Sequence, residues 1–164
     1  MALCWCHSSA CLSLKKKIAS SQIRKSKYEG QSIKAIPIRV LTVGKRRSKG
    51  TQLLVEEYTQ KIKYYCNIED TLIKSNPKAT SDVRSQIEAE DMLMMQHITP
   101  DDFGSVRLTF CIGGPYGHGS LVRERADMSI RLSSLVLNHQ VALIVLLEQI
   151  YRAWTIIKRQ KYHH

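Results

Sequence analysis

Four glycines lie within seven residues between Gly113 and Gly119. Glycine adopts positive φ angles without strain and lets a ligand approach the backbone N–H groups closely, so this cluster could bind a ligand through its main chain. The cluster lacks the Gly-x-Gly-x-x-Gly fingerprint of dinucleotide sites, and no Gly-Lys-Ser/Thr sequence follows it as in a P-loop. By itself, the cluster fits a tight structural turn equally well.

A second candidate is the segment Arg131–Gln140, in which small hydroxyl side chains are interleaved with leucines. Such a segment can form a pocket wall that holds a purine through backbone hydrogen bonds and apolar contacts. Without its neighbours in the sequence, the same segment is an ordinary strand end.

A third candidate is the basic segment 158–164, which contains the histidine pair His163 and His164. No cysteine or acidic residue stands at a metal-ligand spacing from this pair. Cys66 and Cys111 are isolated from one another in or beside apolar runs, and we expect Cys111 to be a core thiol. The sequence therefore predicts no metal site.

These candidates must be positioned by an alternation of strands and helices. Apolar, β-branched runs predict strands at 36–43, 68–73, 106–112 and 129–137, the last one including a loop. Helical periodicity predicts a helix capped by Thr51, a helix at 81–96, a short helix at 121–126 and a long one at 139–158. The order predicts an α/β fold with a mostly parallel sheet and helices on both faces. The glycine cluster would then follow a strand end, where open sheets bind ligands.

Two of the predicted helices carry apolar faces. The helix at 81–96 has Val83, Ile87, Met92 and Met95 roughly on one side. The helix at 139–158 has a stripe broad enough to suggest a dimer interface, and Glu148 with Arg152 is spaced for a helix ion pair. The stripe consists of Leu143, Leu146, Leu147, Ile150, Trp154 and Ile157.

The charge is concentrated at the N-terminus. The chain has 25 Lys and Arg against 14 Asp and Glu, and the first 34 residues hold seven of these bases with the single acid Glu29. This Ser-rich, basic segment is typical of a transit peptide, for the chloroplast or alternatively the mitochondrion. The alternative is a disordered basic arm that binds RNA in place. The sequence thus divides into residues 1–34 as a leader and residues 35–164 as one domain.

The composition also excludes several classes of protein. With 43% hydrophobic and 24% charged residues, the chain is not disordered throughout. Its longest unbroken apolar run is Val141–Leu147, well short of the ~20 residues of a membrane span. Five cysteines, three of them in the leader, do not make a disulfide scaffold.

Several features occur together in a fixed order. The glycine cluster precedes Leu-Ser-Ser-Leu-x-Leu-x-His at 132–139, Leu-Leu-Glu-Gln-x-Tyr-Arg-Ala-Trp at 146–154 and a Tyr-His-His tail at 162–164. Together they resemble the RlmH family of SPOUT methyltransferases, which methylate N3 of a pseudouridine in large-subunit ribosomal RNA. The resemblance runs from about Ile36 to His164 and is densest after Val106. The Asn76-Pro77 and Asp82-Val83-Arg84 stretches are similar to the plant branch of the family.

The resemblance implies a homodimer with a C-terminal trefoil knot that binds S-adenosylmethionine and acts on the rRNA of an assembled organellar ribosome. It assigns cofactor binding to Gly113 and to Leu132, Ser133, Ser134, Leu135, Val136 and Leu137. Neither a metal nor a membrane is implied.

Methyl transfer to a uracil ring nitrogen requires a base that removes the imino proton. His139 could serve, or the tail pair His163 and His164 with Tyr162 as an orienting group, and we favour the tail because in a knotted dimer it can reach either cofactor. Basic residues would contact RNA phosphates, although a solvated charged face is the alternative. These residues are Lys45, Arg46, Arg47, Arg152, Lys158, Arg159 and Lys161.

The chain departs from the family in one place. Family members have a further strand and helix before the strand at 106–112, and that strand ends in a turn whose leucine contacts the cofactor. Here Asp102-Phe103-Gly104-Ser105 leads directly to Val106, so about two dozen residues are missing. The missing segment is one wall of the cofactor pocket. The alternative function is therefore a catalytically impaired, dimeric RNA- or ribosome-binding protein.

Overall fold

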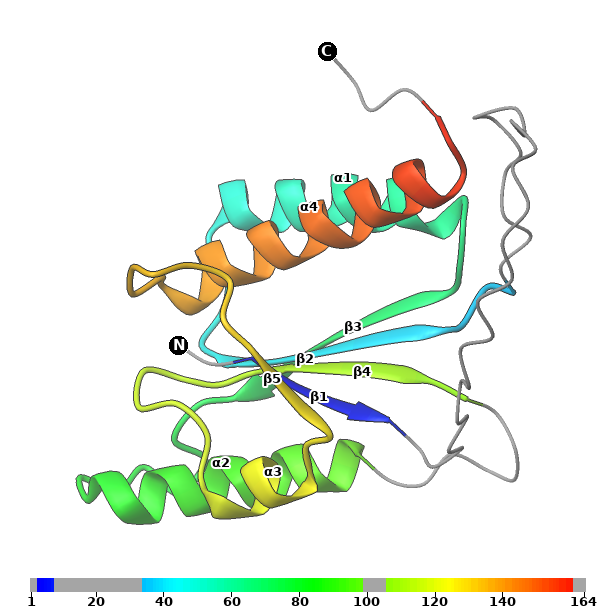
Figure 1. Ribbon diagram of the computed structural model, residues 1–164. Helices are drawn as coiled ribbons and strands as arrows, with labels where there is room; N and C mark the ends of the chain where they lie inside the picture. The colour runs from blue at the N-terminus through cyan, green and yellow to red at the C-terminus, as the bar shows by residue number, and fades with distance from the viewer. Residues whose placement is uncertain (1–2, 8–33, 99–105, 161–164) are drawn as a thin grey trace, which may run out of the picture.

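The computed structural model describes residues 3–7, 34–98 and 106–160. The elements in chain order are β1 (Leu3–His7), β2 (Ile38–Gly44), α1 (Lys49–Lys63), β3 (Ile68–Lys74), α2 (Val83–His97), β4 (Leu108–Ile112), α3 (Ser120–Arg125), β5 (Met128–Ile130) and α4 (His139–Ile157). They form three layers, in which the sheet lies between α1 and α4 on one face and α2 and α3 on the other (Figure 1).

The sheet has the strand order β3-β2-β4-β1-β5. β2 pairs in parallel with β3 and β4, whereas β1 pairs antiparallel with both β4 and β5. Four of the described strands therefore run in one direction and β1 runs in the other. This confirms the predicted α/β class with a mostly parallel sheet and helices on both faces. The trefoil knot stays a prediction.

The strand β1 comes from the segment that the sequence assigns to a leader. Leu3–His7 lies between β4 and β5, with Leu3 opposite Ile112 on one side and Ile130 on the other. Part of the segment 1–34 thus belongs to the sheet, and the predicted domain boundary at residue 35 leaves this strand out.

The buried strand β2 carries apolar residues on both of its faces. Its Ile38 and Val40 belong to the core beneath α1 and α4, and its Leu41 and Val43 belong to the core beside α2 and α3. A parallel strand covered by helices on both faces is apolar at successive positions. The strands expected at 36–43, 68–73 and 106–112 are confirmed as β2, β3 and β4.

The helix α1 begins three residues earlier than expected, so the prediction that Thr51 caps it is wrong. Ser48 is the cap, and its Oγ accepts a hydrogen bond from Thr51 N at 3.2 Å. The Thr51 hydroxyl instead donates to Gln140 Oε1 at 2.8 Å and so connects α1 to the start of α4.

The helix α2 buries a different side from the predicted one. Val83 is 40% exposed and Met92 is 55% exposed, although both were expected on the packed face. The side chains that α2 does bury include two acids, which have hydrogen-bond partners in neighbouring loops and can therefore be buried. The buried residues are Gln86, Ala89, Glu90, Asp91 and Met94.

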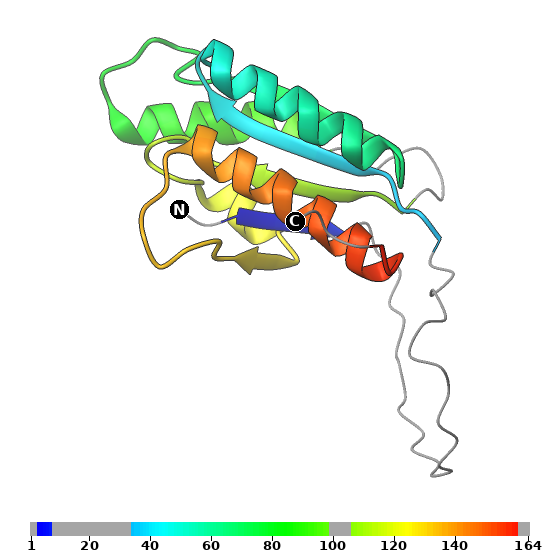
Figure 2. The same ribbon diagram turned by 90° about the horizontal axis from the view of Figure 1, so that it is seen from above.

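The long helix α4 lies beside α1 on one face of the sheet (Figures 1 and 2). Its predicted apolar stripe is confirmed, because Leu143 and Leu147 are fully buried and Trp154 stacks on Tyr65 with ring centroids 5.9 Å apart. The predicted helix ion pair is also confirmed, with Arg152 Nη2 2.8 Å from the nearer Glu148 oxygen.

By length and composition alone, α4 is the one helix in the described part of the chain that could cross a membrane. A core helix has the same properties, and α4 packs its apolar side against the sheet and α1. The buried stripe therefore accounts for its hydropathy. Cys66 and Cys111 are both buried, as expected for Cys111.

Candidate functional site

The loops that follow the parallel strands lie at one edge of the sheet. β4 leads into the glycine cluster at 113–119, and β5 leads into residues 131–138. Both loops lie at the carboxyl edge, on the left in Figure 1. Ligands of open α/β sheets bind beyond the carboxyl ends of the strands, so the two predicted cofactor segments share the expected edge.

The glycine cluster forms a tight turn that favours glycine at Gly113 because of close contact and at Gly117 because of its backbone angle. Gly117 N donates to Gly114 O at 3.0 Å, and Gly117 has a φ angle of +83°. A Cβ on Gly113 would lie only 2.7 Å from the carbonyl carbon of Gly117. The turn thus has a structural need for glycine, and its main chain remains at the edge where a ligand would approach.

The far arm of this turn is fixed by α2 and β4. Asp91 accepts hydrogen bonds from Gly119 N at 2.9 Å and from Val122 N at 3.3 Å. His118 is 4% exposed, and its Nε2 lies 3.2 Å from the carbonyl oxygen of Cys111, to which it can donate. Burial lowers the pKa of His118, so its imidazole is neutral near pH 7. These bonds tie the turn rigidly to the end of β4.

The near arm of the turn contacts the buried Glu90. Its Oε1 accepts hydrogen bonds from Ser75 Oγ at 2.9 Å, from Asn76 N at 2.8 Å and from Gln86 Nε2 at 2.8 Å. Its Oε2 is buried without a partner in the described part of the chain, and a Cβ on Gly114 would lie 2.9 Å from it. A buried carboxylate oxygen with no donor is costly, which marks Glu90 as a candidate functional residue that sequence analysis missed.

Residues Leu132–Leu137 form a loop that exposes apolar surface. The expected strand at 129–137 is confirmed only as far as Ile130. Ser133 Oγ accepts from Leu135 N at 3.0 Å, while Leu135 is 74% exposed and Val136 is 89% exposed. Adjacent exposed apolar residues at a sheet edge favour contact with a ligand or partner.

Three cavities formed by described residues lie elsewhere. One is an apolar hollow between α4 and the sheet, lined in part by Ile38, Phe110 and Trp154. The other two adjoin the loop between β2 and α1. None of the three is lined by Gly113 or Leu132–Leu137, so these segments share an edge rather than one of these cavities.

The candidate base His139 lies at the start of α4 against the end of β2. A Cβ on Gly44 would be 2.8 Å from His139 Nε2, which is buried and has no hydrogen-bond partner among the described residues. Burial, and then the charge of Arg47, lower the pKa of His139 and keep the imidazole neutral. Val43, the residue before Gly44, faces the core beside α2 and α3 and lies 3.2 Å from where a Cβ on Gly114 would be. His139 therefore lies near the same end of β2 as the glycine turn, but on the face of the sheet that α4 covers.

The phosphate contact predicted for Arg47 stays a prediction, and in the structure this side chain has a protein partner. Arg47 forms a bidentate ion pair with Asp70, with Nη2 2.8 Å from Oδ1, and its side chain is only 7% exposed. A guanidinium buried against a carboxylate would have to leave that carboxylate to bind phosphate. Lys45 and Arg46 are exposed and line a hollow with Lys74 at the ends of β2 and β3.

The other predicted RNA contacts lie at the far end of the molecule. Lys158 and Arg159 are exposed just beyond α4, and Arg152 carries the ion pair with Glu148. The 19 residues of α4 span about 28 Å at ~1.5 Å per residue, so these bases do not form one surface with Lys45 and Arg46. The predictions for Lys161, Tyr162, His163 and His164 fall on residues that the structure does not describe.

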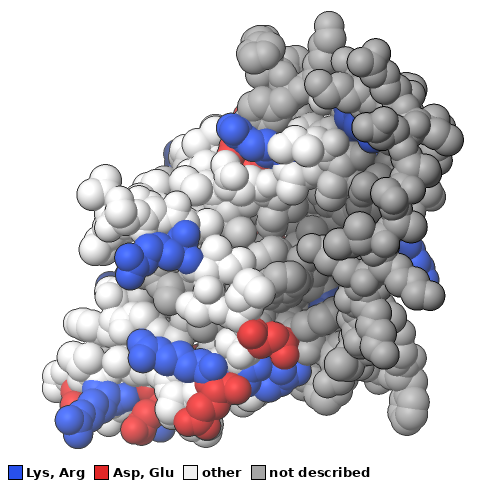
Figure 3. Space-filling view, in the orientation of Figure 1, with Lys and Arg blue, Asp and Glu red and all other residues white. Residues whose placement is uncertain are grey.

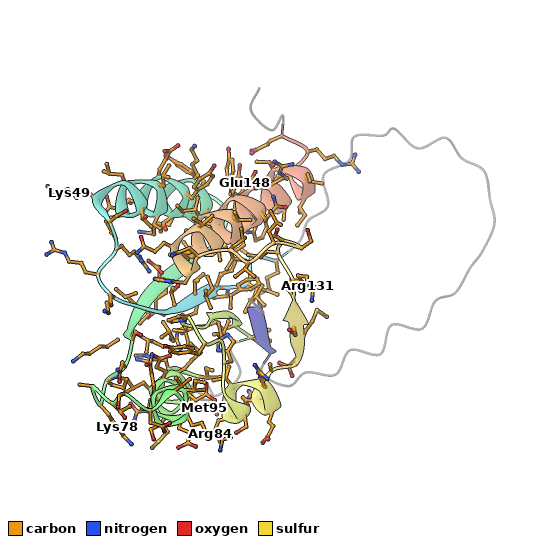
Figure 4. The ribbon with its side chains drawn as sticks, turned by 90° about the vertical axis from the view of Figure 1, so that its left-hand side faces the viewer. Lys49, Lys78, Arg84, Met95, Arg131 and Glu148 are labelled. Carbon is orange, nitrogen blue, oxygen red and sulfur yellow. The ribbon has the colours of Figure 1, made fainter. Side chains whose placement is uncertain are left out.

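The visible charge is mixed on the faces shown. Over α2 and α3, basic and acidic side chains alternate (Figure 3). At the carboxyl edge, Lys49 and Arg131 lie on opposite sides (Figure 4). In the described part of the chain, no three His, Cys, Asp or Glu side chains gather as a metal site requires.

A sequence signal for Glu90 and Asp91 exists in retrospect. The helix 81–96 has weak apolar periodicity, and two consecutive acids stand in its middle. When apolar residues do not define one face, acids can form the buried face if loop N–H groups satisfy them. The apolar pattern alone pointed instead to Met92 and Val83.

A family model described as "Predicted SPOUT methyltransferase" matches residues 36–106 and 101–163. A protein of Arabidopsis thaliana named "Putative RNA methyltransferase" is 50% identical over 167 residues, covering 86% of each chain. Two bacterial proteins named "Ribosomal RNA large subunit methyltransferase H" also match. The one from Flavobacterium psychrophilum is 31% identical, over 77% of this chain and 98% of the relative. The one from Thermus thermophilus is 32% identical, over 77% of this chain and 97% of the relative.

These matches also locate the missing segment. The family model matches in two pieces that meet at residues 101–106. The alignment with the Arabidopsis protein spans 167 residues but covers only 86% of a 164-residue chain, so part of that relative has no counterpart here. The divided family match points to a position just before β4, and the alignment supports the absence of a segment without placing it.

Proposed function

The chain belongs to the SPOUT methyltransferase family, and we propose that it is an RNA methyltransferase that uses S-adenosylmethionine to methylate N3 of a pseudouridine in large-subunit rRNA. The family match over residues 36–106 and 101–163 carries the proposal. The bacterial relatives are named for the large ribosomal subunit, which supports that substrate. The N3 position rests on the resemblance to the RlmH family.

Two sides of a cofactor site fit S-adenosylmethionine. The glycine turn at Gly113 offers main-chain groups without side chains, and Leu132–Leu137 offer exposed apolar side chains at the same edge. When bound, the cofactor supplies an electrophilic methyl group on a positively charged sulfur. The residues of this chain would orient it in line with the ring nitrogen, since positioning carries much of the rate of such a transfer. The leucine turn that forms a third side in the family is missing.

The uracil N3 proton needs an acceptor, and His139 is in a suitable state. Its imidazole is kept neutral by burial and by Arg47, and its Nε2 lone pair or proton has no partner among the described residues. A neutral imidazole can accept a proton, whereas a charged one cannot. We therefore keep His139 as one candidate base, and the tail pair His163 and His164, oriented by Tyr162, as the other.

In the proposed homodimer, the tail residues would act at the site of a second copy. Gln160 is held near the end of α4, because its N–H donates to Thr155 O at 2.9 Å and its side chain accepts from the Tyr65 hydroxyl. His139, at the other end of α4, lies about 24 Å from Thr155 along the helix. The last described residue is thus remote from His139 of its own copy.

A dimer would also explain the separation of the basic residues. Lys45 and Arg46 lie at one end of α4, and Lys158 and Arg159 lie at the other. If the tail of one copy reaches the cofactor edge of its partner, the basic end of one copy approaches the basic end of the other. The combined surface could follow an RNA backbone, with phosphate contacts positioning the base.

The organelle is part of the proposal. The basic, Ser-rich leader supports import into a chloroplast, or alternatively a mitochondrion, whose ribosomes would supply the substrate.

The missing segment favours a second candidate function. A chain that lacks one wall of the cofactor pocket but keeps Lys45, Arg46, Lys158 and Arg159 could act as a catalytically impaired, dimeric RNA- or ribosome-binding protein. Such a protein would bind large ribosomal subunits in a salt-dependent way and transfer no methyl group.

Calorimetric titration of the full-length chain with S-adenosylmethionine, followed by transfer of a labelled methyl group to undermethylated large ribosomal subunits, distinguishes the two functions. The methyltransferase gives binding heat and labelled rRNA. No heat at millimolar cofactor, together with salt-dependent subunit binding, would support the second function. Inserting the unmatched residues of the Arabidopsis relative into this chain between residues 101 and 106 is the matched control, since regained transfer assigns the loss to the deletion.

A further inference from the structure

The strand β1 completes the sheet between two other strands. It pairs over five residues with β4 and over three residues with β5, and it is the one connection between them in the strand order. Among the described strands, β5 pairs with β1 alone. Without Leu3–His7, one side of β4 and the whole of β5 would therefore lose their ladder hydrogen bonds, which is costly for a buried strand.

The direction of β1 follows from where the chain continues. His7 pairs with Leu108 from one side, and Ile38 pairs with Leu108 from the other. The end of β1 and the start of β2 are thus about 10 Å apart, two strand spacings. A parallel strand of five residues would instead end at the opposite edge, about 17 Å further along, and would need a crossover connection. An N-terminal segment can therefore enter this position most simply in the antiparallel direction.

The family match is divided at residues 101–106, immediately before β4. By the resemblance to the RlmH family, the part missing there includes a strand. The strands β4 and β5 run in the same direction with a space for one strand between them. We propose that the space between β4 and β5 is a strand-binding site left by the missing segment, and that its occupant is the segment Leu3–His7 of the same chain.

This assignment gives the leader a structural role in addition to any targeting role. While Leu3–His7 is in the sheet, it is unavailable to an import receptor that binds the leader. Removal of the leader would open the strand position beside the glycine turn and the loop after β5. The full-length and processed chains would then differ at the carboxyl edge that the proposed cofactor occupies.

The pairing can be tested directly because Cys4 lies opposite Cys111. Directly opposite residues in an antiparallel pair have Cα atoms about 4.5–5.5 Å apart, within the ~4.4–6.8 Å that a disulfide spans. Cys6 lies opposite Thr109, and its diagonal distance to Cys111 of about 7–8 Å is too long. The chain therefore contains its own matched control.

The full-length chain would be oxidised with the azo compound diamide and the disulfides mapped by mass spectrometry. Two S–H bonds break, one S–S bond forms, and the two hydrogens reduce diamide to its hydrazine. We expect Cys4–Cys111 as the main intramolecular product, at least tenfold above Cys6–Cys111 or Cys11–Cys111. A mixture of the three leader cysteines on Cys111, or no leader crosslink to Cys111, would overturn the assignment.

Hydrogen exchange provides a second measurement that does not need the thiols. Proline cannot donate a ladder hydrogen bond in a central strand, so Cys4→Pro should speed exchange of the Met128–Ile130 amides at least tenfold. Ser20→Pro, in the same leader but outside β1, should leave these amides unchanged. Equal exchange in both variants would contradict the proposal.

Discussion

Replacing Arg47 with alanine should destabilise the fold, although the sequence suggests a surface contact with phosphate. The guanidinium binds both carboxylate oxygens of Asp70, and the side chains are 7% and 13% exposed. Removing one partner of a buried ion pair costs about 3–5 kcal/mol, because the other charge stays buried without compensation. Since Asp70 keeps some contact with solvent, we expect about 2–4 kcal/mol. For a domain of this size, 3 kcal/mol corresponds to a fall in Tm of about 10 °C.

Urea titration and thermal unfolding would measure this loss against Arg46→Ala. Arg46 is exposed, so its loss should change the free energy of unfolding by no more than about 0.5 kcal/mol. The same variant should weaken RNA binding and reduce the salt dependence of affinity by about one phosphate contact. Replacing both members of the pair, Arg47→Met with Asp70→Leu, should recover most of the stability because no charge is left buried.

The opposite pattern would refute this reasoning. If Arg47→Ala unfolds at the wild-type urea midpoint and weakens RNA binding as much as Arg46→Ala, the guanidinium is a phosphate ligand. The ion pair with Asp70 would then carry no stability.

Three further predictions follow from burial and from the glycine turn. Gly113→Ala should lower the free energy of unfolding by about 1–3 kcal/mol, because its Cβ would lie 2.7 Å from the opposite arm of the turn. Gly50→Ala should raise the free energy of unfolding by up to ~1 kcal/mol, because Gly50 lies in α1 with open space around it. Urea titration of the two variants checks these opposite signs. Burial lowers the pKa of His118, so as the pH falls the unfolded chain takes up a proton before the folded chain does. The free energy of unfolding should therefore be level above the ordinary pKa of 6.5 and decrease below it. In unfolding experiments between pH 7 and pH 5, His118→Gln should remove up to ~1.4 kcal/mol per pH unit of this decrease. Leu147→Ala should cost about 2–5 kcal/mol because Leu147 is fully buried, whereas Val136→Ala, at an 89% exposed position, should leave Tm unchanged and weaken S-adenosylmethionine binding in calorimetry.

The parallel core of the sheet was predictable because its strands are buried on both faces. In β2, Ile38 and Val40 enter one core and Leu41 and Val43 enter the other, so both faces of the strand carry apolar residues. The stripe of α4 was predictable from its helical spacing, since Leu143, Leu147 and Trp154 all face one core. The fold class could therefore be predicted from the long segments with a clear apolar pattern.

The short strand β1 could not be predicted from its own residues. Leu3–His7 is a five-residue segment in a basic, Ser-rich leader, and its pairing depends on strand edges more than 100 residues away. Local composition therefore indicated a leader and gave no signal of a position in the sheet.

The candidate site was predictable in its backbone and less so in its side chains. Gly113 and Leu132–Leu137 follow strand ends, so their shared edge was implied by the element order. The burial of Arg47, Glu90 and Asp91 depends on partners distant in sequence. Without knowledge of these partners, a charged residue is expected to be exposed. That is why Arg47 was assigned to RNA and Glu90 was missed.

The most direct test of the central claim is hydrogen exchange of the full-length chain with and without S-adenosylmethionine. If the cofactor binds at the carboxyl edge of the sheet, amides of residues 113–119 and 132–137 should exchange more slowly when it is present. Protection confined to other segments, such as the hollow beside Lys45 and Arg46, would contradict the claim. Unchanged exchange in both loops at saturating cofactor would contradict it as well.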